Sequence, residues 1–230
     1  MFAFPPSISS LPILGREERF PVRRVYCVGR NYTAHVREMM EADERDPPFF
    51  FQKPADAIVT NGARIPYPSD TADLQFEAEL VVAIGAPAFR IPAERARTVI
   101  FGYGIGVDLT RRDRQREAFD AGLPWEAGKS FDCSAPCGAI HPVDRVGHPA
   151  TGAITLSVNG EIRQDDDIDQ MIWKVPEIIA NLSQSYRLEP GDLILTGTPA
   201  GVGTIGSGDA LLVEIEGLEP LDFSIGPPAT

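Results

Sequence analysis

One short stretch, residues 74–84, constrains the fold more than any other part of the chain. It reads Leu-Gln-Phe-Glu-Ala-Glu-Leu-Val-Val-Ala-Ile, so apolar and polar residues alternate over its first half. Successive side chains of a strand point to opposite faces, so the alternation predicts a strand with Glu77 and Glu79 on one face, about 7 Å apart. From Leu80 onward the run is wholly apolar, which is typical of a strand that enters a core.

The two glutamates need a partner if their face is buried. Neighbouring carboxylates repel each other unless a pKa rises, basic side chains pair with them, or a cation binds. A hard divalent cation with oxygen ligands would suit them. The alternative is an edge strand with a solvated acidic face, and the pair alone does not decide between the two.

The charge balance narrows the possible partners. The 230 residues include 33 Asp and Glu against 21 Lys and Arg, a net charge of −12. This excess argues against a nucleic acid or a membrane surface as partner, and an anionic substrate would require locally clustered basic residues. No apolar run approaches the roughly 18–20 residues of a membrane span, and no signal-peptide pattern begins the chain. The three cysteines do not suggest a disulfide framework, so we expect a cytoplasmic protein.

The pattern along the chain predicts a β-rich α+β fold with a few peripheral helices. Residues 1–20 are rich in proline and predict an extended N-terminal arm, and residues 21–230 contain no linker that would divide them. We expect strands at 21–28, 102–108, 193–196 and, last, 210–216, with a hairpin at 154–163. We expect helices at 33–40, 92–101, 111–121 and 168–186, the last broken or kinked at Pro176, and a charged loop at 41–48.

One glycine motif and two of the histidines are weaker indications of a functional site. Gly201–Gly206 matches G-x-G-x-x-G, but a dinucleotide site needs a helix directly afterwards, and the residues that follow predict a strand. We therefore expect a wide turn with backbone amides available to an anion. His141 and His148 lie in segments rich in proline and glycine, where surface loops are expected.

His35 and Glu38 form a more specific pair. They are three residues apart on a predicted helix, so they share a face, and Glu38 can orient the imidazole and raise its basicity. Such pairs are also common as purely structural contacts.

Six motifs occur in the order found in one known family. They are V-Y-C-V-G-R-N-Y-x-x-H-x-x-E (25–38), F-x-K-P (51–54), F-E-A-E-L (76–80), G-V-D-L-T-x-R-D (106–113), L-P-W-x-x-G-K-S-F (123–131) and L-T-G-T-P-x-G-V-G (195–203). Together they resemble the fumarylacetoacetate hydrolase family from residue 24 to about residue 223.

The resemblance implies a mixed β-sandwich or roll, usually a homodimer, with Mg²⁺ or Mn²⁺ in the cleft. It implies these roles: Glu77, Glu79 and Asp108 as metal ligands; His35 and Glu38 for activating water; Lys129 for stabilising negative charge; and Arg30, Lys53, Arg112, Gln115 and Thr198 for binding substrate.

The implied activity is metal-dependent hydrolysis of a C–C bond in a small 2-oxo acid, an acylpyruvate such as fumarylpyruvate. The same site could decarboxylate oxaloacetate, or hydrate or isomerise a 2-oxo-enoate, because each reaction passes through an enolate. A fold and a metal site do not separate these reactions. A further alternative is an acidic module without activity that binds Ca²⁺ or a basic partner.

Overall fold

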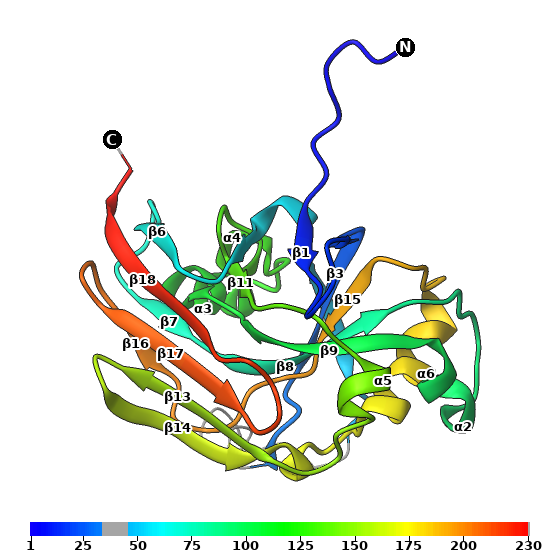
Figure 1. The fold of residues 1–230 in the computed structure, drawn as a ribbon. Coiled ribbons are helices and arrows are strands. Elements are labelled where there is room, and N and C mark those ends of the chain that lie inside the picture. The colour runs from blue at the N-terminus through cyan, green and yellow to red at the C-terminus, as the bar shows by residue number, and fades with distance from the viewer. Residues whose placement is uncertain (34–45, 230) are drawn as a thin grey trace.

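The structure is a computed structural model that describes residues 1–33 and 46–229 (Figure 1). The predicted pair His35 and Glu38, most of the predicted helix at 33–40 and most of the charged loop at 41–48 lie outside these residues. The described chain is rich in strands, and its helices are short.

Two main sheets form the body of the molecule. The larger one has the order β4 (Phe49–Lys53), β3 (Arg24–Gly29), β15 (Asp192–Leu195), β8 (Ala78–Ile84), β9 (Ile100–Val107), β11 (Ala135–Cys137) and β5 (Ile58–Thr60), and β12 (His141–Pro142) also pairs with β9. The second has the order β14 (Glu161–Asp167), β13 (Ala153–Val158), β17 (Ala210–Ile215), β18 (Leu221–Pro228) and β6 (Ala63–Tyr67).

Two smaller sheets and several short helices complete the fold. The small sheets are β10 (Thr110–Arg111), β7 (Leu74–Phe76) and β16 (Gly203–Thr204), and β1 (Ser10–Pro12) with β2 (Arg19–Pro21). The helices are α2 (Ala93–Ala96), α3 (Arg112–Asp120), α4 (Glu126–Lys129), α5 (Val143–Val146) and α6 (Val175–Ser185), with 3₁₀ turns η1 (Ala55–Ala57), η2 (Arg97–Val99) and η3 (Ile168–Gln170).

Strand β8 separates two hydrophobic cores, as its alternation requires. Leu80 and Val82 face the main core, to which α6 and the second sheet also contribute. Val81 and Ala83 face a smaller core closed by Leu11 and other residues of the N-terminal segment. The apolar half of the predicted strand is therefore buried on both faces.

The predicted strand 74–84 is interrupted at Glu77. Before the break, β7 pairs with β10 and β16, and after it β8 pairs with β9 and β15. The Asp108 amide donates to the Glu77 carbonyl across the break, at 2.8 Å. Because Ala78 is paired with Val107 in the antiparallel β8–β9 ladder, Glu79 and Asp108 come close together at one end of it.

Two expectations for the C-terminal half are wrong. The predicted helix 168–186 begins only at Val175, because Pro176 occupies its first turn, where a missing amide proton costs nothing. Residues 168–170 form the separate turn η3. The strand predicted as last is followed by β18, which pairs with both β17 and β6 and so closes the second sheet.

The expected surface loop is wrong for His141, whereas His148 does lie in an irregular segment and is half-buried. His141 is buried in β12, and its Nε2 accepts a hydrogen bond from the Glu219 amide at 2.9 Å. His148 Nδ1 lies 2.8 Å from the Tyr103 hydroxyl. Both rings thus serve the packing around β9.

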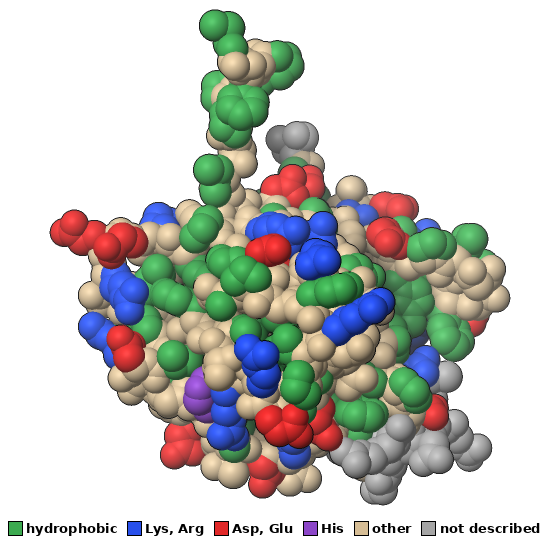
Figure 2. Space-filling model, turned by 90° about the vertical axis from the view of Figure 1, so that its right-hand side faces the viewer, with side chains coloured by type: hydrophobic (Ala, Val, Ile, Leu, Met, Phe, Trp, Pro, Cys, Tyr) green, Lys and Arg blue, Asp and Glu red, His purple; other side chains and the backbone are tan. Residues whose placement is uncertain are grey.

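The first residues of the chain extend away from the body (Figures 1 and 2). Met1, Phe2, Phe4 and Ile8 are exposed. From Ser10 onward the segment joins the fold through the β1–β2 pair. No helix in the described part of the chain is long and apolar enough to cross a membrane.

Candidate active site

Three carboxylates meet where β7, β8 and β9 come together. One oxygen each of Glu77, Glu79 and Asp108 can be chosen so that all three lie within 4.8 Å of one another, and all three residues are buried. The sequence prediction that Glu77 and Glu79 share a face is consistent with this arrangement. The solvated edge-strand alternative is excluded, because β8 lies inside the large sheet.

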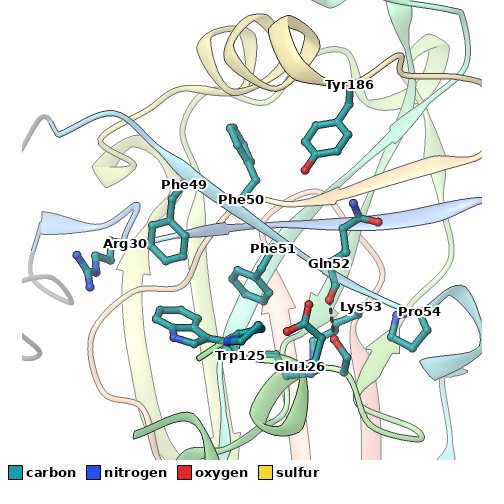
Figure 3. Close-up of a pocket in the computed structure, with 13 residues that line it drawn as sticks. Arg30, Phe49, Phe50, Phe51, Gln52, Lys53, Pro54, Trp125, Glu126 and Tyr186 are labelled. Carbon is teal, nitrogen blue, oxygen red and sulfur yellow. Dashed lines mark hydrogen bonds between the residues drawn. The ribbon is translucent and has the colours of Figure 1, made fainter. Parts of the chain in front are cut away.

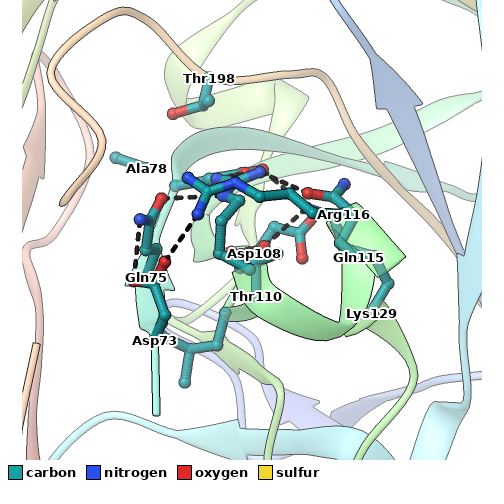
Figure 4. A network of polar contacts seen from close by, with 12 residues as sticks. Asp73, Gln75, Ala78, Asp108, Thr110, Gln115, Arg116, Lys129 and Thr198 are labelled. Carbon is teal, nitrogen blue, oxygen red and sulfur yellow. Dashed lines mark hydrogen bonds and ion pairs between the residues drawn. The ribbon is translucent and has the colours of Figure 1, made fainter. Parts of the chain in front are cut away.

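Three basic side chains, Lys129, Lys53 and Arg112, form ion pairs with this carboxylate cluster. Figure 4 shows the polar network around Asp108 and Lys129. Lys129 Nζ donates to Glu77 Oε2 at 2.9 Å, to Asp108 Oδ2 at 2.8 Å and to Thr110 Oγ1 at 2.7 Å. Burial alone would lower the pKa of Lys129, but Asp108 and Glu77 outweigh it, so the pKa is raised. The ammonium therefore stays charged.

Lys53 and Arg112 approach the cluster from two other elements. Lys53 Nζ lies 2.8 Å from Asp108 Oδ1 and also donates to the carbonyls of Leu109 and Lys129, so β4 is attached to the loop below the cluster. Arg112, at the start of α3, places its Nη2 2.5 Å from Glu77 Oε1. Glu77 and Asp108 each have two cationic neighbours.

Glu79 differs from the other two carboxylates. Among the described residues no lysine or arginine forms an ion pair with it, and its Oε2 accepts a hydrogen bond from the Gly197 amide at 2.6 Å. Burial raises the pKa of Glu79 well above its usual range, and Asp108 and Glu77 raise it further. A cation that touched all three carboxylates would remove this cost.

The donor set fits Mg²⁺ or Mn²⁺. These hard cations prefer carboxylate oxygens, and Mg²⁺ keeps some coordination positions for water or substrate. Asp108 Oδ1 is buried and, despite the nearby Lys53 ammonium, makes no aligned hydrogen bond, so a lone pair remains for a cation. Glu77, Glu79 and Asp108 would hold the ion.

A cavity of about 440 Å³ opens above the cluster. Its polar lining includes Glu77, Glu79, Arg30, Arg112, Gln115, Lys129 and Thr198. Gln115 Oε1 accepts a bond from Arg112 Nη1 at 2.6 Å, which orients its amide. Thr198 lies on the loop that passes over the network (Figure 4).

A second cavity of about 830 Å³ adjoins the first, because both are lined by Arg30, Phe49, Phe51, Trp125 and Lys129. The Trp125 ring packs edge-on against Phe49, with centroids 5.1 Å apart (Figure 3). The Arg30 guanidinium lies over the Phe49 ring at 5.5 Å. These aromatic rings form a wall between the carboxylate cluster and the outer cavity.

Arg30 occupies an unusual backbone position. Its φ of 60° is left-handed, a conformation that costs about 1–2 kcal/mol for a residue with a Cβ. The next residue, Asn31, is buried and donates to the carbonyls of Thr196 and Trp173 at 2.7 and 3.0 Å. These bonds anchor the turn and hold Arg30 at the rim of both cavities.

The structure brings most of the predicted site residues together. The three predicted ligands, Lys129, Arg30, Arg112, Gln115 and Thr198 all line the inner cavity or the cluster below it. Lys53 lies beneath Asp108 and contributes to the outer cavity. His35 and Glu38 lie outside the described residues.

Three polar residues that support the site were not predicted from the sequence: Gln75, Asn31 and Gln164. Gln75 Oε1 accepts from Arg112 Nε at 2.8 Å, and Gln164 Nε2 donates to Thr198 Oγ1 at 2.9 Å. Gln75 stands between Leu74 and Phe76, which is a signal of a buried polar group, whereas Gln164 stands between Arg163 and Asp165 and gives no such signal. The sequence contains no indication of their partners, because those lie 37 and 34 residues away.

Comparison with known proteins identifies the family to which this site belongs. A family model described as the C-terminal domain of fumarylacetoacetate (FAA) hydrolase matches residues 24–225. A fumarylpyruvate hydrolase from Ralstonia sp. is 44% identical over 78% of this chain and 93% of its own length. The oxaloacetate tautomerase YcgM from Escherichia coli is 42% identical over 86% of this chain and 90% of its own length.

A solved structure extends the similarity to the whole fold. The crystal structure of fumarylpyruvate hydrolase from Pseudomonas aeruginosa in complex with Mn²⁺ and pyruvate superposes with a TM-score of 0.97. It is 49% identical in sequence and covers 99% of this chain and 100% of that one. The chain belongs to the fumarylacetoacetate hydrolase family, and its cofactor is Mg²⁺ or Mn²⁺.

Proposed function

We propose that this protein is a metal-dependent acylpyruvate hydrolase that cleaves fumarylpyruvate to fumarate and pyruvate. The observation that carries the proposal is the position of the buried carboxylate cluster at the floor of a cavity with basic side chains. A bound Mg²⁺ or Mn²⁺ ion would polarise the 2-oxo acid as a Lewis acid. The relatives described above include fumarylpyruvate hydrolases.

Residues of the inner cavity would bind the 2-oxo acid end of the substrate. Thr198 can donate its hydroxyl proton to the carboxylate, and Arg112 and Gln115 line the same cavity. We assign the activation of water to His35 and Glu38, as the family resemblance implies. Water attacks the remote carbonyl, the C–C bond breaks, and its electron pair leaves with the pyruvate enolate, which is then protonated.

Lys129 would stabilise the developing negative charge by its field. All three of its ammonium protons are already donated, to Glu77, Asp108 and Thr110. It therefore acts from its fixed position beside the cluster, or it exchanges the Thr110 bond for an oxygen of the substrate. A preorganised cation in a buried site can be worth several kcal/mol to the transition state.

The acyl end of the substrate would extend along the aromatic wall. Phe49, Phe51 and Trp125 present flat apolar surfaces between the two cavities, which suit a planar unsaturated chain. Arg30 stands at the rim of both cavities and is the candidate for the distal carboxylate, since its guanidinium pairs bidentately with planar anions. Oxaloacetate is too short to bridge these positions.

Tautomerisation of oxaloacetate is the second candidate function. Relatives with that activity are 42% and 39% identical to this chain. The same cluster would serve it, because keto–enol exchange also passes through a stabilised enolate. In that case Arg30 and the aromatic wall would contribute little to selectivity.

A panel of 2-oxo acids separates these candidates. We expect kcat/KM for fumarylpyruvate hydrolysis, measured by pyruvate release with Mn²⁺, to exceed that for any reaction of oxaloacetate at least tenfold, because a lost charge-assisted bond costs about 1.5–3 kcal/mol. Metal-stripped protein should be inactive until Mn²⁺ is restored. Equal or reversed preference would favour an activity on oxaloacetate. No activity on any substrate would favour an acidic binding module.

We further propose that the protein is a homodimer, as the family resemblance implies. The exposed apolar arm of Met1, Phe2, Phe4 and Ile8 offers surface that a second copy could cover. Light scattering of the full chain would show twice the monomer mass. A monomer at micromolar concentration would contradict this assignment.

A further inference from the structure

Gln164, on β14 of the second sheet, is fully buried and connects the strand that carries Glu79 to the loop that carries Thr198. Its Oε1 accepts a bond from the Ala78 amide at 3.0 Å, and Ala78 stands between Glu77 and Glu79. Its Nε2 donates to Thr198 Oγ1 at 2.9 Å and to the Pro199 carbonyl at 2.8 Å.

A β-bulge directs Gln164 into this position. In the β13–β14 ladder, Leu156 pairs with Gln164 but Ser157 pairs with Ile162, so Arg163 is an extra residue. Bulges re-aim side chains, and Gln164 is the fully buried residue of a strand that is otherwise partly or fully exposed. The loop that carries Thr198 rests on the bulge: a Cβ at Gly201 would lie 2.1 Å from the Arg163 carbonyl oxygen.

The orientation of the Gln164 amide follows from its partners. A backbone N–H can only donate, so the group facing Ala78 is the oxygen. The Pro199 carbonyl can only accept, so the group facing it is the nitrogen. The Ala78 and Pro199 contacts thus define the same orientation of the Gln164 amide, with its nitrogen toward Thr198. Thr198 Oγ1 must therefore accept a hydrogen bond from Gln164.

The bond from Gln164 fixes the hydrogen-bonding role of the Thr198 hydroxyl. Within the described part of the chain, its hydroxyl accepts the bond from Gln164 and donates none. The proton of the hydroxyl is available to an acceptor in the inner cavity, which Thr198 lines. A carboxylate is such an acceptor.

We propose that Gln164 is a positioning residue that makes Thr198 an obligate donor and ties its loop to the strand bearing the metal ligands. The site thereby selects a carboxylate beside the metal. The inference rests on the proposed function, since it assigns the substrate's 2-oxo acid carboxylate to Thr198.

The test is a double-mutant cycle read by calorimetry of pyruvate binding to the Mn²⁺-loaded protein. Gln164→Glu keeps an acceptor for the Ala78 amide but replaces the donor to Thr198 by a second acceptor, which would take the Thr198 proton. Thr198→Val removes the hydroxyl at nearly constant volume. Gln170→Glu is the matched control, because Gln170 is an exposed amide on the adjacent turn η3.

We expect Thr198→Val and Gln164→Glu each to weaken pyruvate binding by about tenfold, the effect of one lost hydrogen bond to a charged group. The double variant should be no more than about twofold weaker than Thr198→Val, because both changes remove one interaction. The control should bind pyruvate as the wild type does.

Additive losses in the double variant, or unchanged pyruvate affinity in Gln164→Glu, would overturn the inference. If Gln164→Glu does not fold, Gln164→Met, which is neutral and of similar size, completes the same cycle with the same criterion. A wild-type protein that binds Mn²⁺ but no pyruvate would instead contradict the proposed function.

Discussion

Replacing Lys129 by methionine should change metal-free stability and metal affinity in opposite directions. The ammonium is buried and pairs with Glu77 and Asp108 at 2.9 and 2.8 Å. Breaking a buried ion pair by removing one partner costs about 3–5 kcal/mol. Lys53 and Arg112 still neutralise one carboxylate each, so we expect the lower end, about 3 kcal/mol, or a fall in Tm of about 6–12 °C for a chain of this size.

The same change should strengthen Mn²⁺ binding. In the wild type three carboxylates face three cations, Lys53, Arg112 and Lys129, and the substitution leaves one carboxylate in excess. We expect Mn²⁺ to bind at least about tenfold more tightly, a gain of about 1.4 kcal/mol, while hydrolysis is lost. Lys174→Met, at an exposed lysine, is the matched control.

Thermal unfolding in EDTA and calorimetric Mn²⁺ titration measure the two effects. Lys174→Met should resemble the wild type in both. If Lys129→Met were as stable as the wild type without metal and bound Mn²⁺ no more tightly, Lys129 would not be compensating the cluster, and the electrostatic reasoning would be refuted.

Three further predictions concern other parts of the site. Arg30→Gly and Arg30→Ala should both lower kcat/KM for fumarylpyruvate about tenfold and so reduce the preference for fumarylpyruvate over oxaloacetate. Because φ at residue 30 is left-handed, Arg30→Gly should be more stable than Arg30→Ala by about 1 kcal/mol. Equal stability of the two variants in urea unfolding would contradict the backbone strain at this position. His35→Ala should keep wild-type Mn²⁺ affinity and lose at least about a hundredfold in kcat, and an active variant would exclude it as the base. Burial would raise the pKa of Asp113, but bonds from the Thr71 hydroxyl and the Ala72 and Arg114 amides outweigh it and lower the pKa. Its folded pKa thus lies below the unfolded one, so the stabilisation is present above about pH 4 and lost as pH falls through the folded value. The stability advantage of wild type over Asp113→Asn should therefore shrink in urea unfolding between pH 5 and pH 3, and a constant difference would contradict it.

Local patterns predicted the strands and the carboxylates well. The alternation at 74–84 and the apolar run after Leu80 are properties of one strand, so the sequence alone indicates that Glu77 and Glu79 share a face. The break at Glu77 was not predictable, because it depends on β10 and β16 pairing with β7 from distant positions. The late start of α6 could have been predicted, since proline is favoured in a first turn.

The contacts that hold the site residues in place could not be predicted from the sequence. The partners of Gln164 are fixed by a bulge and by a loop more than 30 residues away, and neither has a local signature. Likewise, nothing near Glu79 in the sequence shows that its neighbours Glu77 and Asp108 would be paired with cations while it would not. Such contacts are set by the tertiary structure and not by the periodicity of one element.

Calorimetric titration of Mn²⁺ into the metal-free wild type and Glu79→Gln tests the central claim most directly. Glu79 is buried with a raised pKa and, among the described residues, has no ion-pair partner, so its carboxylate should matter more to a metal than to the fold. We predict one Mn²⁺ per chain in the wild type, binding at least about a hundredfold weaker in Glu79→Gln, and equal or higher Tm of that variant without metal. Glu214→Gln, at an exposed position of β17, should bind as the wild type does. Unchanged Mn²⁺ affinity in Glu79→Gln would contradict the account.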